Sequence, residues 1–254
     1  MHLTWLDNNS WLIEMGEQRI LLDPWFVGPL VFGNLPWFFK GERRTPRAIP
    51  EHIDLILLSQ GLEDHAHTPT LEQLDRSIPV VASPNAAKVV QGLGYQKVTV
   101  LPHGESFVLR DRVAIKAIPG SPVGPFLVEN GYLLEDLRTG TSLYYEPHGY
   151  HSAMLQEGTS VDIIISPIIN VELPFIGAIL QGWDSVLDVV RGLKPQVLVP
   201  TAAGGEIEFS GVLNNVLQIK GSTEELRHQL EANNLATQLL EPEPGKRFKL
   251  ELKS

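Results

Sequence analysis

The sequence contains no cysteine among its 254 residues. This absence excludes disulfide bonds, thiolate metal ligands and a cysteine nucleophile, and it is consistent with a reducing compartment. Basic residues are also scarce: 20 lysines and arginines stand against 30 aspartates and glutamates, which gives a formal net charge of -10. A charge of that sign opposes attraction to phosphate backbones, so we expect no nucleic-acid partner.

Targeting and membrane signals are missing as well. The first residues, MHLTWLDNNS, have neither the basic nor the apolar stretch of a secretory signal, and no run of about 18 apolar residues occurs. We therefore expect a cytoplasmic protein without a transmembrane segment. The chain also lacks the Gly-x-Ser-x-Gly elbow of serine hydrolases and the glycine patterns that bind nucleotides.

Short apolar runs alternate with helical patterns along the chain. Residues 10–25 predict a β-hairpin, and IDLILLS at 53–59 predicts a strand that is buried on both faces. Helical patterns follow in four places: 71–77, 84–94, 183–194 and 222–234. This order indicates a layered α/β fold.

The second half of the chain repeats the scheme of the first. NGYLLEDLRTGTSLYYEP at 130–147 parallels NSWLIEMGEQRILLDP at 9–24, and VDIIISP at 161–167 parallels the strand at 53–59. We predict one domain, residues 1–254, built from two similar halves of about 1–120 and 121–254. Chance agreement between short hydrophobic strands is the alternative.

The segment LLSQGLEDHAHTPTL, residues 57–71, holds the densest set of potential metal ligands. Glu63, Asp64, His65 and His67 follow the predicted strand directly. Carboxylates and imidazoles are common ligands of divalent metals. Asp64 and His65 also have an interpretation without metal, in which the carboxylate caps a turn and the histidine donates to a backbone carbonyl.

In their order, these segments resemble the metallo-β-lactamase-fold superfamily, in particular its UlaG-like branch of metal-dependent hydrolases. LILLSQGLEDHAH falls where that family carries His-x-His-x-Asp-His. NGYLLE and TSLYYEPHGY resemble the strands before its bridging aspartate, and LKPQVLVPT resembles the strand before its last histidine. The resemblance covers nearly the whole chain. It implies a four-layer αββα sandwich and a metal site at one edge of it.

Most of the family's ligands are replaced, however, so the active site is degenerate by this comparison. Asp64 and His65 match the aspartate and third histidine of the motif, whereas Gln60 and Leu62 stand at its first two histidines. The other ligand positions fall on Ser121 or Pro122, on Pro147, and on Thr201 or Ala202.

A catalytic zinc typically has three protein ligands and a water, so Asp64 and His65 need partners. Glu146 and His148 flank the lost bridging position, and we predict them as replacement ligands. An oxygen-rich set would suit magnesium or manganese better than zinc. The sequence thus predicts one divalent metal (zinc, manganese or magnesium) on Asp64, His65, Glu146 and His148, or no metal at all.

The other histidines and one acidic residue are weaker candidates. Glu63 and His151 are further possible ligands, whereas we interpret His67, before a Thr-Pro step, as a surface histidine. The remaining histidines are expected in solvent: His2, His52, His103 and His228.

Two apolar segments are interrupted by glycine and proline. WFVGPLVFGNLPWFF at 25–39 and LPFIGAILQGW at 173–183 are too broken to predict regular helices or strands. By the family's plan they flank the mouth of the site, where they could cover an apolar small-molecule ligand or form the interface of a homo-oligomer. Buried core segments are the alternative.

The function predicted from the sequence is a divergent hydrolase of this fold. A rebuilt single-metal site, with Asp64 as the catalytic residue, would hydrolyse an ester or a phosphoester. The alternative is a non-catalytic pseudoenzyme that binds a small ligand or a protein partner in the emptied cleft. A purely structural oligomer subunit is a third possibility.

Overall fold

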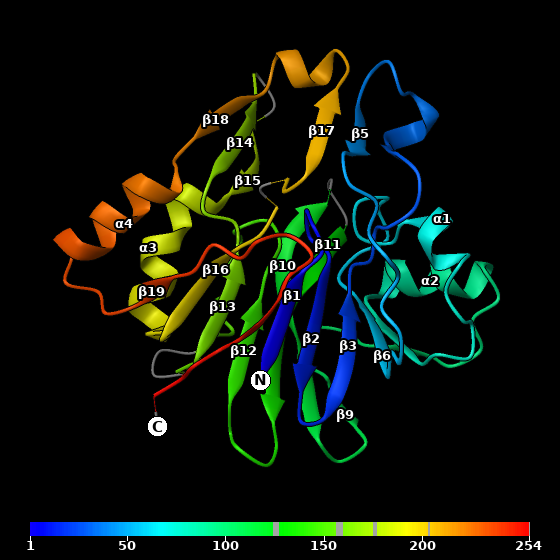
Figure 1. Cartoon of the computed structure of the whole chain (residues 1–254), viewed down its shortest axis with the longest axis horizontal. Coiled ribbons are helices and arrows are strands. Elements are labelled where there is room, and N and C mark those ends of the chain that lie inside the picture. Colours follow the sequence, from blue (N-terminus) through cyan, green and yellow to red (C-terminus); the bar gives the residue numbers. More distant parts are fainter. Residues whose placement is uncertain (124–126, 156–159, 175–176, 203, 254) are drawn as a thin grey trace.

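The computed structural model describes residues 1–123, 127–155, 160–174, 177–202 and 204–253, and two seven-stranded sheets dominate it (Figure 1). The first sheet has the order β20 (Arg247–Lys249), β1 (His2–Trp5), β2 (Trp11–Met15), β3 (Gln18–Leu22), β6 (Leu55–Leu58), β7 (Val80–Ala82) and β8 (Val98–Val100). The second has the order β19 (Gln238–Leu239), β16 (Val197–Pro200), β13 (Ile163–Ser166), β12 (Ser142–Tyr145), β11 (Leu127–Asp136), β10 (Val113–Val123) and β9 (Ser106–Leu109).

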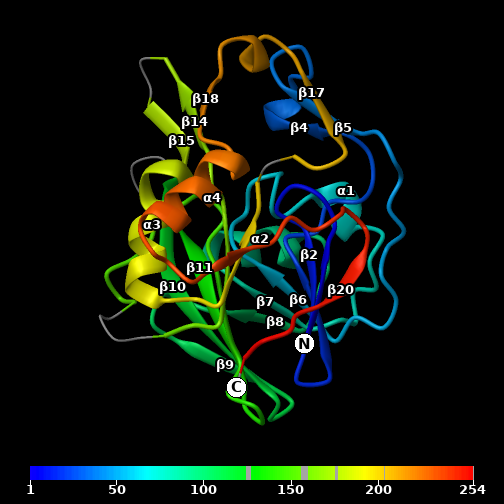
Figure 2. The same ribbon diagram turned by 60° about the vertical axis from the view of Figure 1, so that its left-hand side comes forward.

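In the described ranges, four short helices cover the outer faces of these sheets. They are α1 (Thr68–Leu71), α2 (Pro84–Gly92), α3 (Gly182–Leu193) and α4 (Thr223–Ala232), with 3-10 turns at Phe32–Asn34 and Leu213–Asn215. Figures 1 and 2 show α1 and α2 on the side of the first sheet and α3 and α4 on the side of the second. The layers therefore run helix, sheet, sheet, helix, which confirms the predicted αββα sandwich.

The main core lies between the sheets because side chains alternate along each strand. Trp11 and Ile13 of β2 point into this core, whereas Leu12 between them packs in the outer layer with α1 and α2. In the same way Ile163 of β13 faces the core and Ile164 faces α3 and α4. Strands covered on both faces explain the continuous apolar runs of the sequence.

Two local predictions were wrong. The helix predicted at 71–77 is instead α1, which ends at Leu71, because the Asp75 carboxylate accepts the Ser77 N–H at 2.8 Å and stabilises a turn there. Within the segment 173–183, which was predicted to be too broken for a strand, Gly177–Gln181 form β15, which pairs with β14 (Asn170–Leu173) through a bulge at Val171/Glu172. The hairpin β2–β3, strand β6 and helices α2, α3 and α4 lie where the sequence predicted them.

The change from the first sheet to the second occurs between β8 and β9, and the last strand, β20, returns to the first sheet. The sheets thus divide the chain near residue 105, and the repeat of two similar halves stays a prediction. Among the described residues, none of the helices is both long and apolar enough to span a membrane.

Two three-stranded sheets, called the rim sheets below, stand at one end of the sandwich (Figure 1). One has the order β15, β14 and β18 (Gln218–Lys220), and the other has the order β17 (Ile207–Ser210), β5 (Lys40–Arg43) and β4 (Leu30–Val31). The two apolar segments noted in the sequence contribute β4 and β15, so they lie at this end of the molecule.

Candidate metal centre

The candidate site lies in loops at the end of the sandwich that carries the rim sheets. Strands β3 and β6 are parallel in the first sheet, and β12, β13 and β16 are parallel in the second. Since the carboxyl ends of parallel strands meet at one edge, the residues after β6 and after β12 come together. This brings residues 59–65 beside residues 146–149, which are far apart in the sequence.

Asp64, His65 and His148 form the first group of potential ligands. One ligand atom of each residue lies within 4.8 Å of the others. His65 Nε2 is 3.1 Å from Asp64 Oδ2, and the rings of His65 and His148 have centroids 5.1 Å apart. The structure thus brings three of the four predicted ligands into one cluster.

Glu129, Glu146 and His148 form a second group with the same spacing, so His148 belongs to both. Glu129 on β11 was missed by the sequence analysis. Its Oε1 accepts the Ser121 N–H at 3.1 Å from the neighbouring strand β10. Gly120 leaves room for the two carboxylates, because a Cβ there would lie 3.0 Å from Glu129 Cγ and 3.2 Å from Glu146 Oε1.

Both histidines are held through Nδ1 by a buried carboxylate. His65 Nδ1 is 2.7 Å from Asp23 Oδ2, and His148 Nδ1 is 2.5 Å from Glu129 Oε1. In metal sites this contact fixes the tautomer and the ring orientation of a histidine whose Nε2 binds the metal. The two Nε2 atoms are therefore the ones available to a cation.

The Asp23 carboxylate, which contacts His65, also accepts hydrogen bonds from three other groups. Its Oδ1 accepts the Ser59 N–H at 2.8 Å, and its Oδ2 accepts the hydroxyls of Ser59 at 2.5 Å and Tyr145 at 2.7 Å. Asp23 has a φ of 41°, a backbone conformation that residues other than glycine adopt rarely. Such strain persists only where the surroundings impose it, and it concentrates at functional sites.

Three buried carboxylate oxygens in this cluster have no hydrogen-bond partner among the described residues: Asp64 Oδ1, Glu129 Oε2 and Glu146 Oε1. The other oxygen of Glu146 accepts the N–H groups of His148 at 3.1 Å, of Tyr150 at 2.9 Å and of Gly149. An unpaired buried carboxylate oxygen is unfavourable, and a bound cation would satisfy it. The donor set therefore fits a divalent metal.

Burial and the charges within the cluster shift the pKa values of its own residues. Burial, followed by the charge of Glu129, raises the pKa of Glu146 to about 8. Burial opposes the charge of His65, but Asp64 and Asp23 outweigh it and raise its pKa well above the ordinary range. Glu129 likewise raises the pKa of His148 against the effect of burial. A cation must therefore displace protons when it binds, so its affinity should rise with pH.

An apolar pocket of about 280 Å³ opens beside Asp64 and His148. Both apolar segments line it: Leu30, Phe32 and Phe39 come from the first, and Ile179 and Leu180 from the second. The side chain of Asp64 is 17% exposed and so can be reached from the pocket. A ligand in this pocket would have its end at the candidate metal centre.

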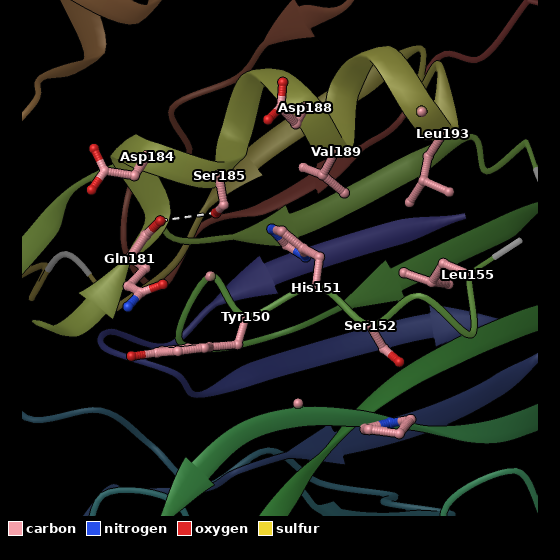
Figure 3. A pocket seen from close by; sticks show the side chains of 14 residues that line it. Tyr150, His151, Ser152, Leu155, Gln181, Asp184, Ser185, Asp188, Val189 and Leu193 are labelled. Atoms are coloured by element: carbon pink, nitrogen blue, oxygen red, sulfur yellow. Dashed lines mark hydrogen bonds between the residues drawn. The ribbon is translucent and has the colours of Figure 1, made fainter. Parts of the chain in front are cut away.

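A larger cavity, of about 610 Å³, lies elsewhere, between α3 and the loop 149–155. Figure 3 shows Asp184, Ser185 and Asp188 of α3 on one side of it and Tyr150 and His151 on the other. The described residues that line it include none of the five potential ligands. The smaller apolar pocket is therefore the cavity that adjoins the candidate metal centre.

A family model described as "Beta-lactamase superfamily domain" matches residues 2–202 of the chain. The chain belongs to this family. It is thus a metallo-β-lactamase-fold, metal-dependent-hydrolase-like protein.

Sequence relatives of this family member match only part of the chain. It is 28% identical to the cytidine monophosphate-N-acetylneuraminic acid hydroxylase of Mus musculus over 115 residues, which are 41% of this chain and 19% of that protein. It is 35% identical to the UPF0173 metal-dependent hydrolase of Herpetosiphon aurantiacus over 94 residues, 36% of this chain and 34% of the relative. The matched segments thus span about a fifth and a third of these proteins.

Solved structures resemble this β-lactamase superfamily chain over 98% of its length. They include the isothiocyanate hydrolase from Delia radicum gut bacteria, with a TM-score of 0.72, 13% identity and 99% of that chain covered. The metallo hydrolase Igni18 from Ignicoccus hospitalis has a TM-score of 0.68, 18% identity and 99% of its chain covered. At these identities the likeness concerns the fold.

The sequence comparison predicted that Gln60, Leu62 and Thr201 stand at three of the family's histidine positions, and these residues differ in their surroundings. Thr201, at the last histidine, is buried; its hydroxyl accepts the Trp11 indole N–H at 3.0 Å and lies 3.1 Å from Asn8 O. Leu62, at the second histidine, is 40% exposed. Gln60, at the first, is buried, and its Oε1 has no hydrogen-bond partner in the described part of the chain. The first and last of these positions are thus still occupied by polar side chains.

The interpretation of His67 as a surface histidine was wrong. His67 is buried, with Nδ1 3.0 Å from Thr70 Oγ1 and its ring 6.0 Å from that of Trp25, because α1 begins directly after it and turns the side chain inward. Among the described residues, neither ligand group includes His67, Glu63 or His151. These three candidates therefore lie outside the candidate centre.

His151 gives a prediction about pH and stability. Burial lowers its pKa to about 4, below the value of about 6.5 expected in the unfolded chain. The unfolded state therefore binds more protons between these values, so the stabilisation is complete above about pH 6.5 and is lost as the pH falls towards 4. Between pH 7 and 4.5, the unfolding free energy of His151→Gln should fall by about 2 kcal/mol less than that of the wild type.

Urea denaturation at a series of pH values measures this difference. His228→Gln, which removes an exposed histidine, is the matched control and should follow the wild type. Parallel pH profiles for His151→Gln and the wild type would contradict the assignment of a half-buried, neutral His151.

Proposed function

We propose that the chain binds one divalent cation at Asp64, His65 and His148, with Glu129 and Glu146 beside them, and hydrolyses an ester or a phosphoester. The observation that carries this proposal is the pair of buried histidines whose Nδ1 atoms are each held by a carboxylate. That arrangement is characteristic of metal-binding histidines. The three unpaired carboxylate oxygens of the cluster support it independently.

A divalent cation bound there would supply polarisation of the scissile group and activation of a water molecule. The chain's own residues would orient the water, accept its proton and exclude bulk water. The Asp64 side chain is 17% exposed and reaches the apolar pocket, so its carboxylate can orient a water there and accept its proton. The apolar wall formed by Phe32, Phe39 and Phe209 would exclude bulk water from the reacting groups.

The donor set also narrows the choice of metal. Two imidazoles suit zinc and iron, whereas carboxylates suit manganese and magnesium, so a mixed set favours zinc, manganese or iron over magnesium.

A pseudoenzyme is the second candidate, and one specific observation favours it. His65 lies between Asp23 and Asp64, and His148 pairs with Glu129, so both imidazolium charges are balanced without a cation. In that case the apolar pocket would bind a ligand without converting it. Metal binding distinguishes the two candidates. If the ion pairs alone neutralise the buried charges, a cation gains no further stabilisation by binding there.

A denaturation experiment tests the proposal. Manganese or zinc at about 100 times its dissociation constant should raise the unfolding free energy by about 2.7 kcal/mol, because only the folded chain brings the ligands together. The Asp64→Asn variant should show a much smaller increase, and a chelator should abolish the effect. Metal-dependent cleavage of p-nitrophenyl esters and phosphodiesters is then the direct assay. Stabilisation without cleavage of any substrate would keep the metal site and refute the hydrolysis, and no stabilisation would refute the metal site and favour the pseudoenzyme.

A further inference from the structure

We infer that the apolar pocket beside the candidate metal centre binds an unbranched alkyl or acyl chain, which makes the substrate a lipophilic ester or phosphoester. The inference rests on the proposed function only for what happens to the polar head of the substrate. The lining and the size of the pocket support the apolar tail independently.

The pocket has polar groups mainly at its inner end. Twelve of its seventeen lining residues are apolar, and Asn8, Asn9, Asp64 and His148 mark the end at the candidate centre. None of the described lining residues is a lysine or an arginine. A nucleotide or another polyanion would need such cations, whereas a molecule with one polar head and an apolar tail matches the distribution.

Three aromatic rings give the pocket a firm wall. The ring centroids of Phe32 and Phe39 are 5.5 Å apart, and those of Phe39 and Phe209 are 5.6 Å apart. These residues come from distant parts of the chain that β5 and β17 hold together by pairing. Rings packed against one another keep their positions, so the pocket exists before a ligand arrives.

The opposite wall is a row of aliphatic side chains on the other rim sheet. Val171 of β14 pairs with Leu180 of β15 on one side and with Ile219 of β18 on the other. Residues directly opposite each other in a sheet point to the same face, and all three line the pocket. The pocket is thus a slot between an aromatic and an aliphatic wall.

The size and the mouth of the slot indicate a slender ligand. A volume of about 280 Å³ is just below the roughly 300–1,000 Å³ usual for ligand sites. Ile179 and Ile219 are 40% and 68% exposed although they line the pocket. Exposed large apolar side chains around a cavity mark a surface that an apolar partner covers, and here the chain of a ligand is the occupant that also reaches Asp64 and His148.

Chain-length dependence of binding tests the inference. Linear primary alcohols from butanol to decanol are titrated into the metal-free protein, and the matching alkylphosphonates into protein with manganese or zinc, by isothermal titration calorimetry. Each added methylene should tighten binding about fourfold until the slot is full. The alcohols test the slot alone because they need no metal.

Two paired variants provide the control. Ile179→Asn/Ile219→Asn changes two exposed lining residues without disturbing the core, and it should remove most of the chain-length dependence. Val100→Asn/Val108→Asn changes two residues that are also exposed, 42% and 48%, but do not line the slot, and it should behave as the wild type.

The outcomes distinguish this inference from the proposed function. Chain-length dependence with the alcohols but no metal binding would support the alkyl slot and refute the metal-dependent hydrolase. Metal binding with affinities that do not change along either series would overturn the slot and leave the hydrolase standing. Self-association that is lost in Ile179→Asn/Ile219→Asn, with no alcohol binding, would also overturn it by assigning the surface to a second copy.

Discussion

Replacing His148 with alanine should weaken the binding of a divalent cation by more than about 100-fold. His148 is the residue shared by the two groups of potential ligands, so its loss reduces both to two members. Removing a residue that only orients a ligand already costs about 10- to 100-fold in metal affinity, and removing a ligand should cost more. Competition with a chromophoric chelator measures the affinity.

His151→Ala is the matched control for this variant. It removes a histidine from the same loop, three residues further along, that belongs to neither group. It should bind metal as the wild type does. Equal losses in the two variants would mean that the loop is needed for folding and that His148 has no special role, and wild-type binding by His148→Ala would contradict the site.

Asp23→Asn should lower both stability and metal affinity. The Asp23 carboxylate accepts from the Ser59 N–H, from two hydroxyls and from His65 Nδ1, all buried. The amide presents a donor where an acceptor is required, and breaking a buried pair in this way typically costs about 3–5 kcal/mol. Because His65 loses its orienting partner, metal affinity should also fall about 10- to 100-fold.

Urea denaturation with Asp54→Asn as the control checks the first part. Asp54 also accepts a backbone N–H and pairs with an arginine, Arg110, but that arginine is 62% exposed, so the change should cost only about 1 kcal/mol. If both variants lost the same small amount, the Asp23 carboxylate would not be a determinant of the site.

The fold was predictable because its strands are covered on both faces or pair in hairpins. The run at 53–59 is apolar throughout because β6 packs on the main core through Leu55 and Leu57 and on the helices through Ile56 and Leu58. Such a run identifies a strand without knowledge of its neighbours. The prediction of a helix at 71–77 was wrong because a single local hydrogen bond, from the Ser77 N–H to the Asp75 carboxylate, stabilises a turn there.

The candidate site was predictable only where it follows directly from the strand order. Asp64, His65, Glu146 and His148 come just after β6 or β12, so their convergence follows from parallel pairing. Glu129 lies within β11, and its direction depends on the pairing with β10, which has a bulge between Pro119 and Pro122. A charged residue inside a buried strand pattern was the available signal for it. Asp23 was visible only as part of an Asp-Pro step, and its contacts with Ser59 and Tyr145 required the assembled sandwich.

Metal analysis of the purified protein is the most direct test of the proposed metal site. The protein is prepared without chelator, incubated with zinc, manganese, iron or magnesium, freed of excess metal and measured by elemental analysis beside the Asp64→Ala/His65→Ala variant. We predict about one metal per chain in the wild type and none in the variant, with both proteins folded. No metal in either folded protein would contradict this prediction and would leave a pseudoenzyme whose buried ion pairs have replaced the cation.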